Sequence, residues 1–244
     1  MPSKKVNNQQ FLPKIVLAVF AHPDDVDFGA AGSIAKWVKT GAKIYYLIAT
    51  RGCKGSTDPK MNSEKLAKVR QKEQQAAARV LGVGKVYFLG HTDGELEPAL
   101  QLKEEIVRFI REVRPDTVLT FDPLMRYSQS RGFVNHPDHI AIGEATLAAV
   151  YPLARDRLTF PAHQKAGLVP HKVREILLTN FDEQNFFVDI TKTFEKKLAA
   201  LKCHRSQYDD FGKLAKMMRK WARVLGKKIK VRYAEGFKRI SIEF

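Results

Sequence analysis

The sequence has little cysteine and no long apolar run. Its 244 residues include two cysteines, Cys53 and Cys203, which form no Cys-x-x-Cys pair. One disulfide at most can form, the pair is not a metal-binding set, and a reducing compartment is favoured. The longest apolar stretches, residues 15–21 and 44–49, are far shorter than the roughly 20 residues of a membrane-spanning helix. Residues 1–14 are polar and lack the pattern of a secretory signal, so we expect a cytoplasmic protein without a membrane span.

The composition is that of a globular protein. Hydrophobic residues make up 44% of the chain and charged residues 28%, which argues against disorder and fibrous repeats. A chain of this length fits one domain of ordinary size and can bury a core without a disulfide or metal staple. Because no internal repeat, low-complexity tract or linker interrupts the sequence, we predict a single domain over residues 1–244.

Positive charge is in excess, and most of the excess lies near the C-terminus. The chain has 42 basic and 26 acidic side chains, a formal net charge of +16 at pH 7. Residues 191–244 contain 16 of the basic and 5 of the acidic residues. Such a block could bind nucleic acid or another polyanion, but a solvated basic helix is the commoner case. No zinc knuckle or RNA-recognition signature accompanies it, and we expect no nucleic-acid partner.

Strand and helix signals alternate along the chain. Short β-rich apolar runs are typical of buried strands, and longer runs with apolar residues three or four apart indicate helices. The alternation predicts an α/β fold of Rossmann-like type, three-layer α/β/α with a mostly parallel sheet, and a smaller C-terminal α+β portion. The expected strands are residues 14–20, 43–50, 85–89, 116–121, 174–179 and 186–190, and the expected helices are residues 30–39, 63–81, 100–113, 139–150 and 192–204.

Acidic and histidine side chains follow the first and the fourth predicted strand. Ala-His-Pro-Asp-Asp occupies residues 21–25, and Asn-His-Pro-Asp-His occupies residues 135–139. In open α/β sheets a ligand binds beyond the carboxyl ends of the strands, so both segments should lie at the functional edge. A phosphate-binding loop would be another use of this edge. The glycines of residues 29–55 form neither the dinucleotide-binding nor the P-loop pattern, which weakens that interpretation.

The two segments contain the ligand types of a catalytic zinc site. Such a site uses three His or carboxylate ligands and leaves a fourth position open for water. His22, Asp25 and His139 can supply that set. The spacing of three residues within each segment puts two side chains on one side of a turn or helix start. Pro137 favours a helix that begins directly after His136.

The two segments also resemble the paired signatures of the LmbE and PIG-L family, the zinc-dependent N-acetylglucosaminyl deacetylases. Ala-His-Pro-Asp-Asp followed downstream by His-Pro-Asp-His is a specific combination in this order. The similarity extends from about residue 14 to the end of the chain. Further matching residues are 70–73, 76–77, 81–82, 93–94, 197–207 and 233–237.

The resemblance implies a metal site and a base. His22, Asp25 and His139 would bind one zinc ion per chain, and Asp24 would act as the general base toward the attacking water. This agrees with the chemistry, because an amide is a poor electrophile and Zn²⁺ both polarises its carbonyl and lowers the pKa of water toward roughly 7. A His/His/Asp site also accepts Fe²⁺, Co²⁺ or Mn²⁺, so the native metal stays open.

The resemblance implies further residues around the metal. His136 would stabilise the oxyanion or protonate the leaving amine, with Asp138 orienting its ring. Arg70 and Asp93 would contact the substrate, the latter at a sugar hydroxyl, and Asp27 is a third candidate contact. As alternatives, Arg70 could pair with a glutamate of its own helix, Asp93 could belong only to a turn, and Asp27 could cap the following helix.

One segment departs from the family. After Thr50 similar proteins often carry Gly-Glu, whereas this chain has Arg-Gly-Cys-Lys-Gly at residues 51–55. Cys53 replaces an acid, and Lys54 adds positive charge near the predicted site. Together with the basic C-terminal block, this leads to the hypothesis of a substrate that bears phosphate or carboxylate. An unchanged ratio of KM for acidic and neutral substrates in Lys54→Glu would refute it.

The sequence therefore predicts a zinc-dependent hydrolase that deacetylates an N-acetylglucosamine-type sugar or its conjugate and releases acetate and a free amine. Another zinc-dependent amidase or esterase on the same scaffold is the nearest alternative. A basic Rossmann-like protein that binds nucleic acid or another anion is an alternative of a different class. The affinity of such a binding protein for its anion would fall steeply with salt, whereas the hydrolase would lose activity when a chelator removes the metal. The oligomeric state is open, and assembly of a homo-oligomer through the C-terminal half is the hypothesis.

Overall fold

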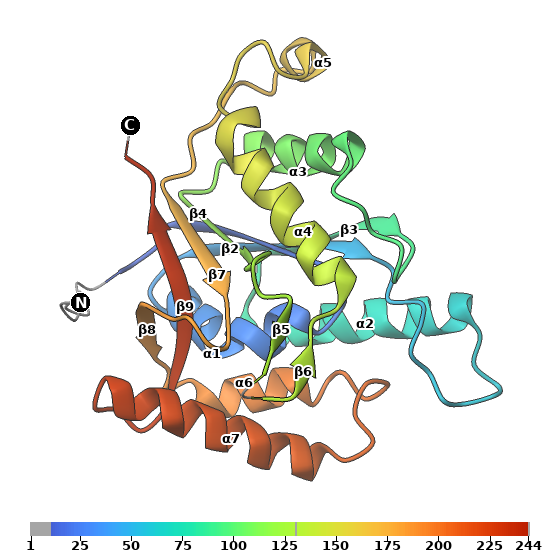
Figure 1. Cartoon of the computed structure of the whole chain (residues 1–244), viewed down its shortest axis with the longest axis vertical. Helices are drawn as coiled ribbons and strands as arrows, with labels where there is room; N and C mark the ends of the chain where they lie inside the picture. Colours follow the sequence, from blue (N-terminus) through green and yellow to red (C-terminus); the bar gives the residue numbers. More distant parts are fainter. Residues whose placement is uncertain (1–10, 130, 244) are drawn as a thin grey trace.

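A central sheet covered by helices on both faces forms the body of the computed structural model, which describes residues 11–129 and 131–243 (Figure 1). The strands of this sheet are β1 (Ile15–Phe20), β2 (Lys43–Thr50), β3 (Lys85–His91), β4 (Thr117–Phe121), β7 (Glu175–Thr179), β8 (Phe186–Asp189) and β9 (Ala234–Ser241). Their order is β3-β2-β1-β4-β7-β9-β8. β9 runs antiparallel to both of its neighbours, and the other neighbouring pairs are parallel. The predicted three-layer α/β fold with a mostly parallel sheet is therefore confirmed.

The helices are divided between the two faces of the sheet. One face is covered by α1 (Asp25–Lys39), α2 (Ser63–Leu81) and α6 (Phe194–Leu201), and the other by α3 (Leu100–Val113) and α4 (Pro137–Ala148) (Figure 1). A longer C-terminal helix, α7 (Phe211–Lys228), packs against β9. The shorter elements are the hairpin of β5 (Tyr127–Ser128) and β6 (Phe133–Val134), the π-helical segment Ala149–Leu153, and α5 (Pro161–Lys165).

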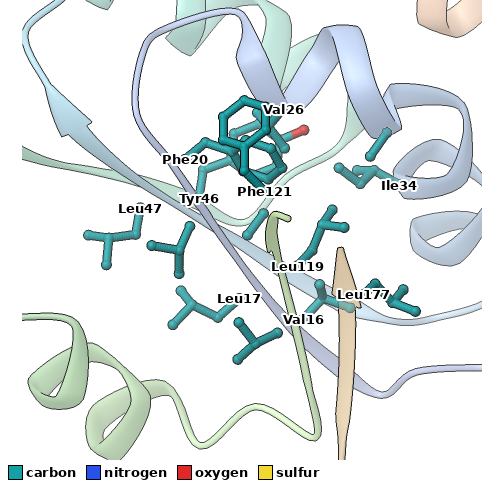
Figure 2. Packing of buried hydrophobic residues seen from close by; sticks show 14 of the residues in the cluster. Val16, Leu17, Phe20, Val26, Ile34, Tyr46, Leu47, Leu119, Phe121 and Leu177 are labelled. Carbon is teal, nitrogen blue, oxygen red and sulfur yellow. The ribbon is translucent and has the colours of Figure 1, made fainter. Parts of the chain in front are cut away.

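The central strands are buried on both faces. Residues 16–20 of β1 have no exposed surface, as expected for a strand inside a parallel sheet with helices on both sides. Figure 2 shows apolar side chains from neighbouring strands packed together, with the rings of Phe20 and Phe121 meeting edge to face at a centroid distance of 4.8 Å. Each fully buried side chain of this kind contributes about 1.5–3 kcal/mol. This packing fixes the carboxyl ends of β1 and β4 relative to each other.

Several elements have the predicted bounds. β2, α2 and α3 lie at the expected residues, and α2 shows why. The Asn62 side chain accepts a hydrogen bond from the N–H of Lys65 at 2.9 Å, and Gly82 ends the helix in the left-handed conformation. Both end signals are readable from residue types. α4 begins at Pro137 with His136 as its N-cap, as the sequence indicated.

Other elements differ from the expectation. α1 begins at Asp25 instead of residue 30, so it includes the acidic residues that the sequence assigned to a loop. Carboxylates are favourable in the first turn of a helix, which explains the earlier start. The sequence predicted neither β9 nor the bounds of α7. The strands of the C-terminal α+β portion, β7, β9 and β8, extend the same sheet.

The search for membrane spans agrees with the short apolar runs of the sequence. No helix within residues 11–129 and 131–243 is long and apolar enough to cross a membrane. The prediction that the chain lacks a secretory signal depends mainly on residues 1–10, which lie outside the described residues.

Candidate metal and catalytic site

The segments that carry the predicted site residues meet at the carboxyl ends of β1 and β4. These strands are neighbours, and the chain continues from them to opposite sides of the sheet. A crevice at such a switch point is the usual ligand site of an open α/β sheet. α4 packs closely on the end of β4, since a Cβ on Gly143 would lie only 2.6 Å from the carbonyl oxygen of Phe121. Glycine thus lets α4 bring its first turn, with His139, beside His22.

The side chains of His22, Asp25 and His139 face one another at short distances, and this set is called the triangle. Nδ1 of His22 lies 3.3 Å from Oδ2 of Asp25 and 3.3 Å from Nε2 of His139. Nε2 of His139 lies 3.3 Å from Oδ1, the other oxygen of the Asp25 carboxylate. Ligand atoms about 2.0–2.1 Å from a tetrahedral zinc ion are separated by about 3.3–3.4 Å. The donor types and their spacing therefore fit a divalent cation with one open position.

Further potential ligands lie close to this triangle. His22, His136 and His139 each offer an atom within 4.8 Å of the others, and so do His22, Asp93, His136 and Asp138. The Asp138 carboxylate accepts two backbone N–H groups, and Oδ2 of Asp25 accepts the N–H of His22 at 2.7 Å. The triangle, with its contacts of 3.3 Å, is the candidate metal site that matches the ligands expected from the sequence.

Asn135 fixes the ring of His139. Its amide nitrogen donates to the carbonyl oxygen of Met125 at 2.7 Å, so its amide oxygen faces Nδ1 of His139 at 2.9 Å. Nδ1 must therefore carry the proton, and the lone pair of Nε2 points to the triangle. Such an outer partner orients a metal-binding histidine and increases its basicity. The sequence segment included Asn135, but residue type alone did not reveal this role.

Two carboxylates fix the ring of His22, as Asn135 fixes the ring of His139. Nε2 of His22 lies 3.0 Å from Oδ2 of Asp138 and 3.2 Å from Oδ1 of Asp93. Asp138 was expected to orient His136, but its Oδ2 is 3.9 Å from Nδ1 of that ring, too far for a hydrogen bond. The structure corrects this expectation: Asp138 orients His22. The second oxygen of Asp93 accepts the N–H of Lys54 at 3.3 Å.

The electrostatics of the cluster favour a cation in the triangle. Burial lowers the pKa of His22, but the carboxylates around it, Asp25 first, outweigh burial and raise that pKa to about 12. Burial raises the pKa of Asp25, and His139 and His22 outweigh this and hold it far below its usual range. The carboxylates thus strongly prefer a positive charge beside them. A divalent cation would supply that charge.

Asp24 is adjacent to the triangle but has different partners. Its Oδ2 accepts a hydrogen bond from the Tyr208 hydroxyl at 3.2 Å, and its Oδ1 lies 3.4 Å from Nη2 of Arg70. Burial raises the pKa of Asp24 to about 6, and Asp25 adds to the increase while Arg70 opposes it. A carboxylate with such a pKa is suited to accept and return a proton near neutral pH.

His136 can act as a hydrogen-bond donor through its Nε2. Its Nδ1 accepts the N–H of Asp138 at 3.2 Å, so the neutral ring carries its proton on Nε2. Burial lowers the pKa of His136, and the neighbouring His22 lowers it further. The two rings meet edge to face with centroids 4.7 Å apart. The neutral donor form is therefore the favoured one.

A family model described as "PIG-L: GlcNAc-PI de-N-acetylase" matches residues 17–150, more than half of the chain. The chain belongs to the PIG-L family. The match includes both histidine segments and the strands that precede them, so the expected family resemblance is confirmed.

Three relatives of this PIG-L chain are named as deacetylases. It is 34% identical to the diacetylchitobiose deacetylase of Thermococcus kodakarensis, over 96% of this chain and 86% of that protein. It is 32% identical to a probable N-acetyl-alpha-D-glucosaminyl L-malate deacetylase 2 of Bacillus cereus, over 79% of this chain and 83% of that protein. The solved N,N'-diacetylchitobiose deacetylase of Pyrococcus horikoshii, in complex with its inhibitor MPG, is 34% identical with a TM-score of 0.87. That alignment covers 94% of this chain and 84% of that one.

Arg70 of this PIG-L chain lies beneath the site. It is buried, and its guanidinium donates to the carbonyl oxygens of Gly52 and Pro23 at 3.3 and 3.0 Å. The two glutamates of its helix, Glu64 and Glu73, bind other side chains, so the alternative of a pair within the helix is wrong. Arg70 thus connects the Pro23 carbonyl, next to Asp24, with the loop that follows β2.

Asp27 is neither a substrate contact nor a helix cap. It lies within α1 and has no exposed surface. Its carboxylate accepts hydrogen bonds from Tyr46, Gln74 and His204. The expectation that Asp27 contacts the substrate is corrected, because three long-range partners that the sequence could not pair keep it inside the protein. His204, one of these partners, is buried.

A cavity of about 500 Å³ opens beside Asp24, Asp25 and His139. The cationic side chain among the described residues that line this cavity is Arg131, whose guanidinium lies over the rings of Phe181 and Trp221 and 3.5 Å from Oδ1 of Asp182. Lys54, to which the sequence assigned that charge, instead pairs with Glu95 at the surface. The aromatic residues are dispersed along the chain, which is why no motif revealed them. The aromatic side chains that line the cavity are Phe28, Phe121, Phe133, Phe181, Tyr208 and Trp221.

Proposed function

We propose that the protein is a zinc-dependent N-deacetylase that hydrolyses the acetamide group of an N-acetylglucosamine-type sugar or its conjugate. Family membership supports the reaction class, and relatives named for diacetylchitobiose and N-acetylglucosaminyl malate support the substrate class. The observation that carries the proposal is the triangle of His22, Asp25 and His139 beside an aromatic cavity.

The proposed metal site binds one ion per chain through those three residues. A bound Zn²⁺ would polarise the amide carbonyl and make a water molecule easier to deprotonate. Asn135 and Asp138 orient the two histidine rings. Fe²⁺, Co²⁺ and Mn²⁺ are the alternative ions for this donor set.

The protein residues then move the protons. Asp24 takes a proton from the attacking water as the new C–O bond forms, and Tyr208 and Arg70 hold its two oxygens in place. His136 donates its Nε2 proton in a hydrogen bond to the oxygen of the tetrahedral carbon. When the C–N bond breaks, protonated Asp24 returns its proton to the leaving nitrogen. The products are acetate and the free amine.

The cavity fits a sugar substrate in size and character. Its volume of about 500 Å³ is within the range of small-molecule sites. Aromatic rings offer flat apolar surfaces for the C–H faces of a sugar ring. The carboxylates that line the cavity can accept hydrogen bonds from the hydroxyl groups of the sugar. Arg131, rather than Lys54, is the residue through which a negatively charged conjugate would be favoured.

The test is acetate release from a panel of acetylated sugars. The panel contains N-acetylglucosamine, its phosphates, diacetylchitobiose and glycosidic conjugates, each incubated with zinc and with a chelator. We expect acetate from at least one member with zinc and none with the chelator. The metal content of each sample is measured in parallel. Protein that holds its metal yet releases no acetate from any member would contradict the proposed substrate class.

A further inference from the structure

The backbone of Asp24 adopts an unusual conformation. Its φ is 98° and its ψ is −31°, on the left-handed side of the map where side chains other than glycine are disfavoured. Such a conformation is unfavourable and persists only when the surroundings enforce it. It turns the chain sharply between two consecutive carboxylates. Asp24 consequently meets Tyr208 and Arg70, whereas Asp25 meets the two histidines of the triangle.

One side chain from α2 holds this backbone in place. The Oε1 atom of Gln74 accepts the N–H of Asp24 at 2.8 Å. Gln74 has no exposed surface, so water does not replace it as the acceptor. A buried N–H without an acceptor is destabilising, which ties this backbone conformation to the presence of the glutamine oxygen.

A buried carboxylate fixes the direction of the Gln74 amide. Its Nε2 donates to Oδ2 of Asp27 at 2.7 Å. The same Oδ2 also accepts from Nε2 of His204 at 2.8 Å, and the other oxygen accepts from the Tyr46 hydroxyl at 3.1 Å. Because these donors occupy the carboxylate, the amide nitrogen must face Asp27 and the amide oxygen must face Asp24.

We propose that Gln74 is a positioning residue that holds the base Asp24 in its productive conformation. It acts through the peptide N–H of residue 24, with Asp27 setting the orientation of its amide. The inference rests on the proposed role of Asp24 as the base. It assigns a purpose to the buried Asp27, whose carboxylate is too deep to reach a substrate. The Gln74 side chain is fully buried, and its hydrogen bonds go to Asp24 and Asp27.

A double-mutant cycle separates positioning from general structural support. Gln74→Met removes the acceptor at similar volume, and Asp24→Asn removes the base. The matched control is Gln75→Met, because Gln75 is the exposed neighbour of Gln74 on the same helix. Kinetics with the best acetylated sugar, metal content and thermal unfolding are measured for the two single variants, the double variant and the control. Gln74→Asn, which retains a buried amide, is carried through the same cycle in case Gln74→Met does not fold.

We expect Gln74→Met to lower kcat by about 10- to 100-fold, because displacing a reacting group by about 1 Å has effects of this size. KM should change by less than about 3-fold and metal content should stay the same, since substrate binding and the triangle are not altered. In the Asp24→Asn background the same substitution should have little further effect. Gln75→Met should behave as the wild type.

Two results would overturn the inference. The first is an unchanged kcat in Gln74→Met. The second is an equal loss of kcat in the presence and absence of the Asp24 carboxylate, which would mean that Gln74 only supports the fold. A fully active Asp24→Asn variant would instead contradict the proposed base itself, so the failure of the proposed function is distinguishable from the failure of this inference.

Discussion

Two adjacent carboxylates have different surroundings and therefore different chemistry. Asp25 lies between two histidines that hold its pKa far below the usual range, despite burial. Asp24 is buried beside the negative charge of Asp25, and its pKa is raised to about 6. One carboxylate is thus suited to bind a cation permanently and the other to exchange a proton.

The correction of the role of Asp138 leads to a prediction at the same scale. Because Asp138 binds Nε2 of His22, Asp138→Asn should weaken metal affinity by about 10- to 100-fold, as loss of such outer partners typically does. At saturating metal, kcat should recover most of the wild-type value. Metal affinity is measured by competition with a chelator, and kcat is measured across a zinc titration.

The opposite result would restore the original expectation for Asp138. If kcat fell while metal affinity stayed at the wild-type value, Asp138 would act through His136 and not through His22.

Motif residues could be predicted from the sequence, whereas their supporting partners could not. His22, Asp25 and His139 lie in two short segments with recognisable spacing, and the structure brings them together. Tyr208 lies 184 positions from its partner Asp24, and Gln74 lies 50 positions away. A single sequence contains no signal for such pairings, because they depend on how distant elements pack.

At the scale of elements, the bounds of a helix could be predicted where its first and last residues carry clear capping signals. α2 has an Asn N-cap and a Gly at its end, and its predicted bounds agree with the structure. For α7 the sequence analysis expected only a solvated basic helix without bounds, although Leu214, Met218 and Ala222 form a buried stripe at helical spacing. That periodicity was available in the sequence and would have revealed the helix. The position of β9 between β7 and β8 was not available, since antiparallel pairing over long distances leaves no local trace.

The antiparallel pairing of β7 with β9 carries an ion pair whose effect depends on pH. Arg239 binds both oxygens of Glu175 at 2.8 Å. Burial raises the pKa of Glu175, but Arg239 and Ser241 outweigh it and hold this pKa below its usual value of 4.5. A carboxylate with a lowered pKa in the folded state stabilises the protein above the unfolded pKa and loses this effect as the pH falls through the folded pKa.

Glu175→Gln should therefore lower the free energy of unfolding by about 1 kcal/mol at pH 7. The difference from the wild type should narrow as the pH falls below 4.5. This difference in the free energy of unfolding is measured by urea unfolding at several pH values. The matched control is Glu183→Gln, because Glu183 pairs with Lys238 on the same strand but its side chain is 71% exposed. Equal effects of the two substitutions at pH 7 would show that the partly buried pair contributes no more to the free energy of unfolding than the exposed pair.

At the scale of the whole molecule, the sheet and the charge distribution have separate roles. The order of the strands creates the switch point between β1 and β4 that holds the site. The C-terminal charge lies partly on α7, which has seven basic and no acidic residues and buries its apolar stripe. This agrees with the expected solvated basic helix. We retain the single-domain organisation, the cytoplasmic location and a homo-oligomer as proposals.

We propose that His22, Asp25 and His139 form the metal site, and the metal content of variants tests this assignment most directly. Wild-type protein, His139→Ala, Asp25→Ala and His136→Ala are incubated with Zn²⁺ and dialysed, and bound zinc per chain is measured by elemental analysis. We predict about one ion per chain in the wild type and in His136→Ala, and less than about 0.1 in the other two variants. Zinc retained in Asp25→Ala but lost in His136→Ala would contradict the account and move the metal to the set of three histidines.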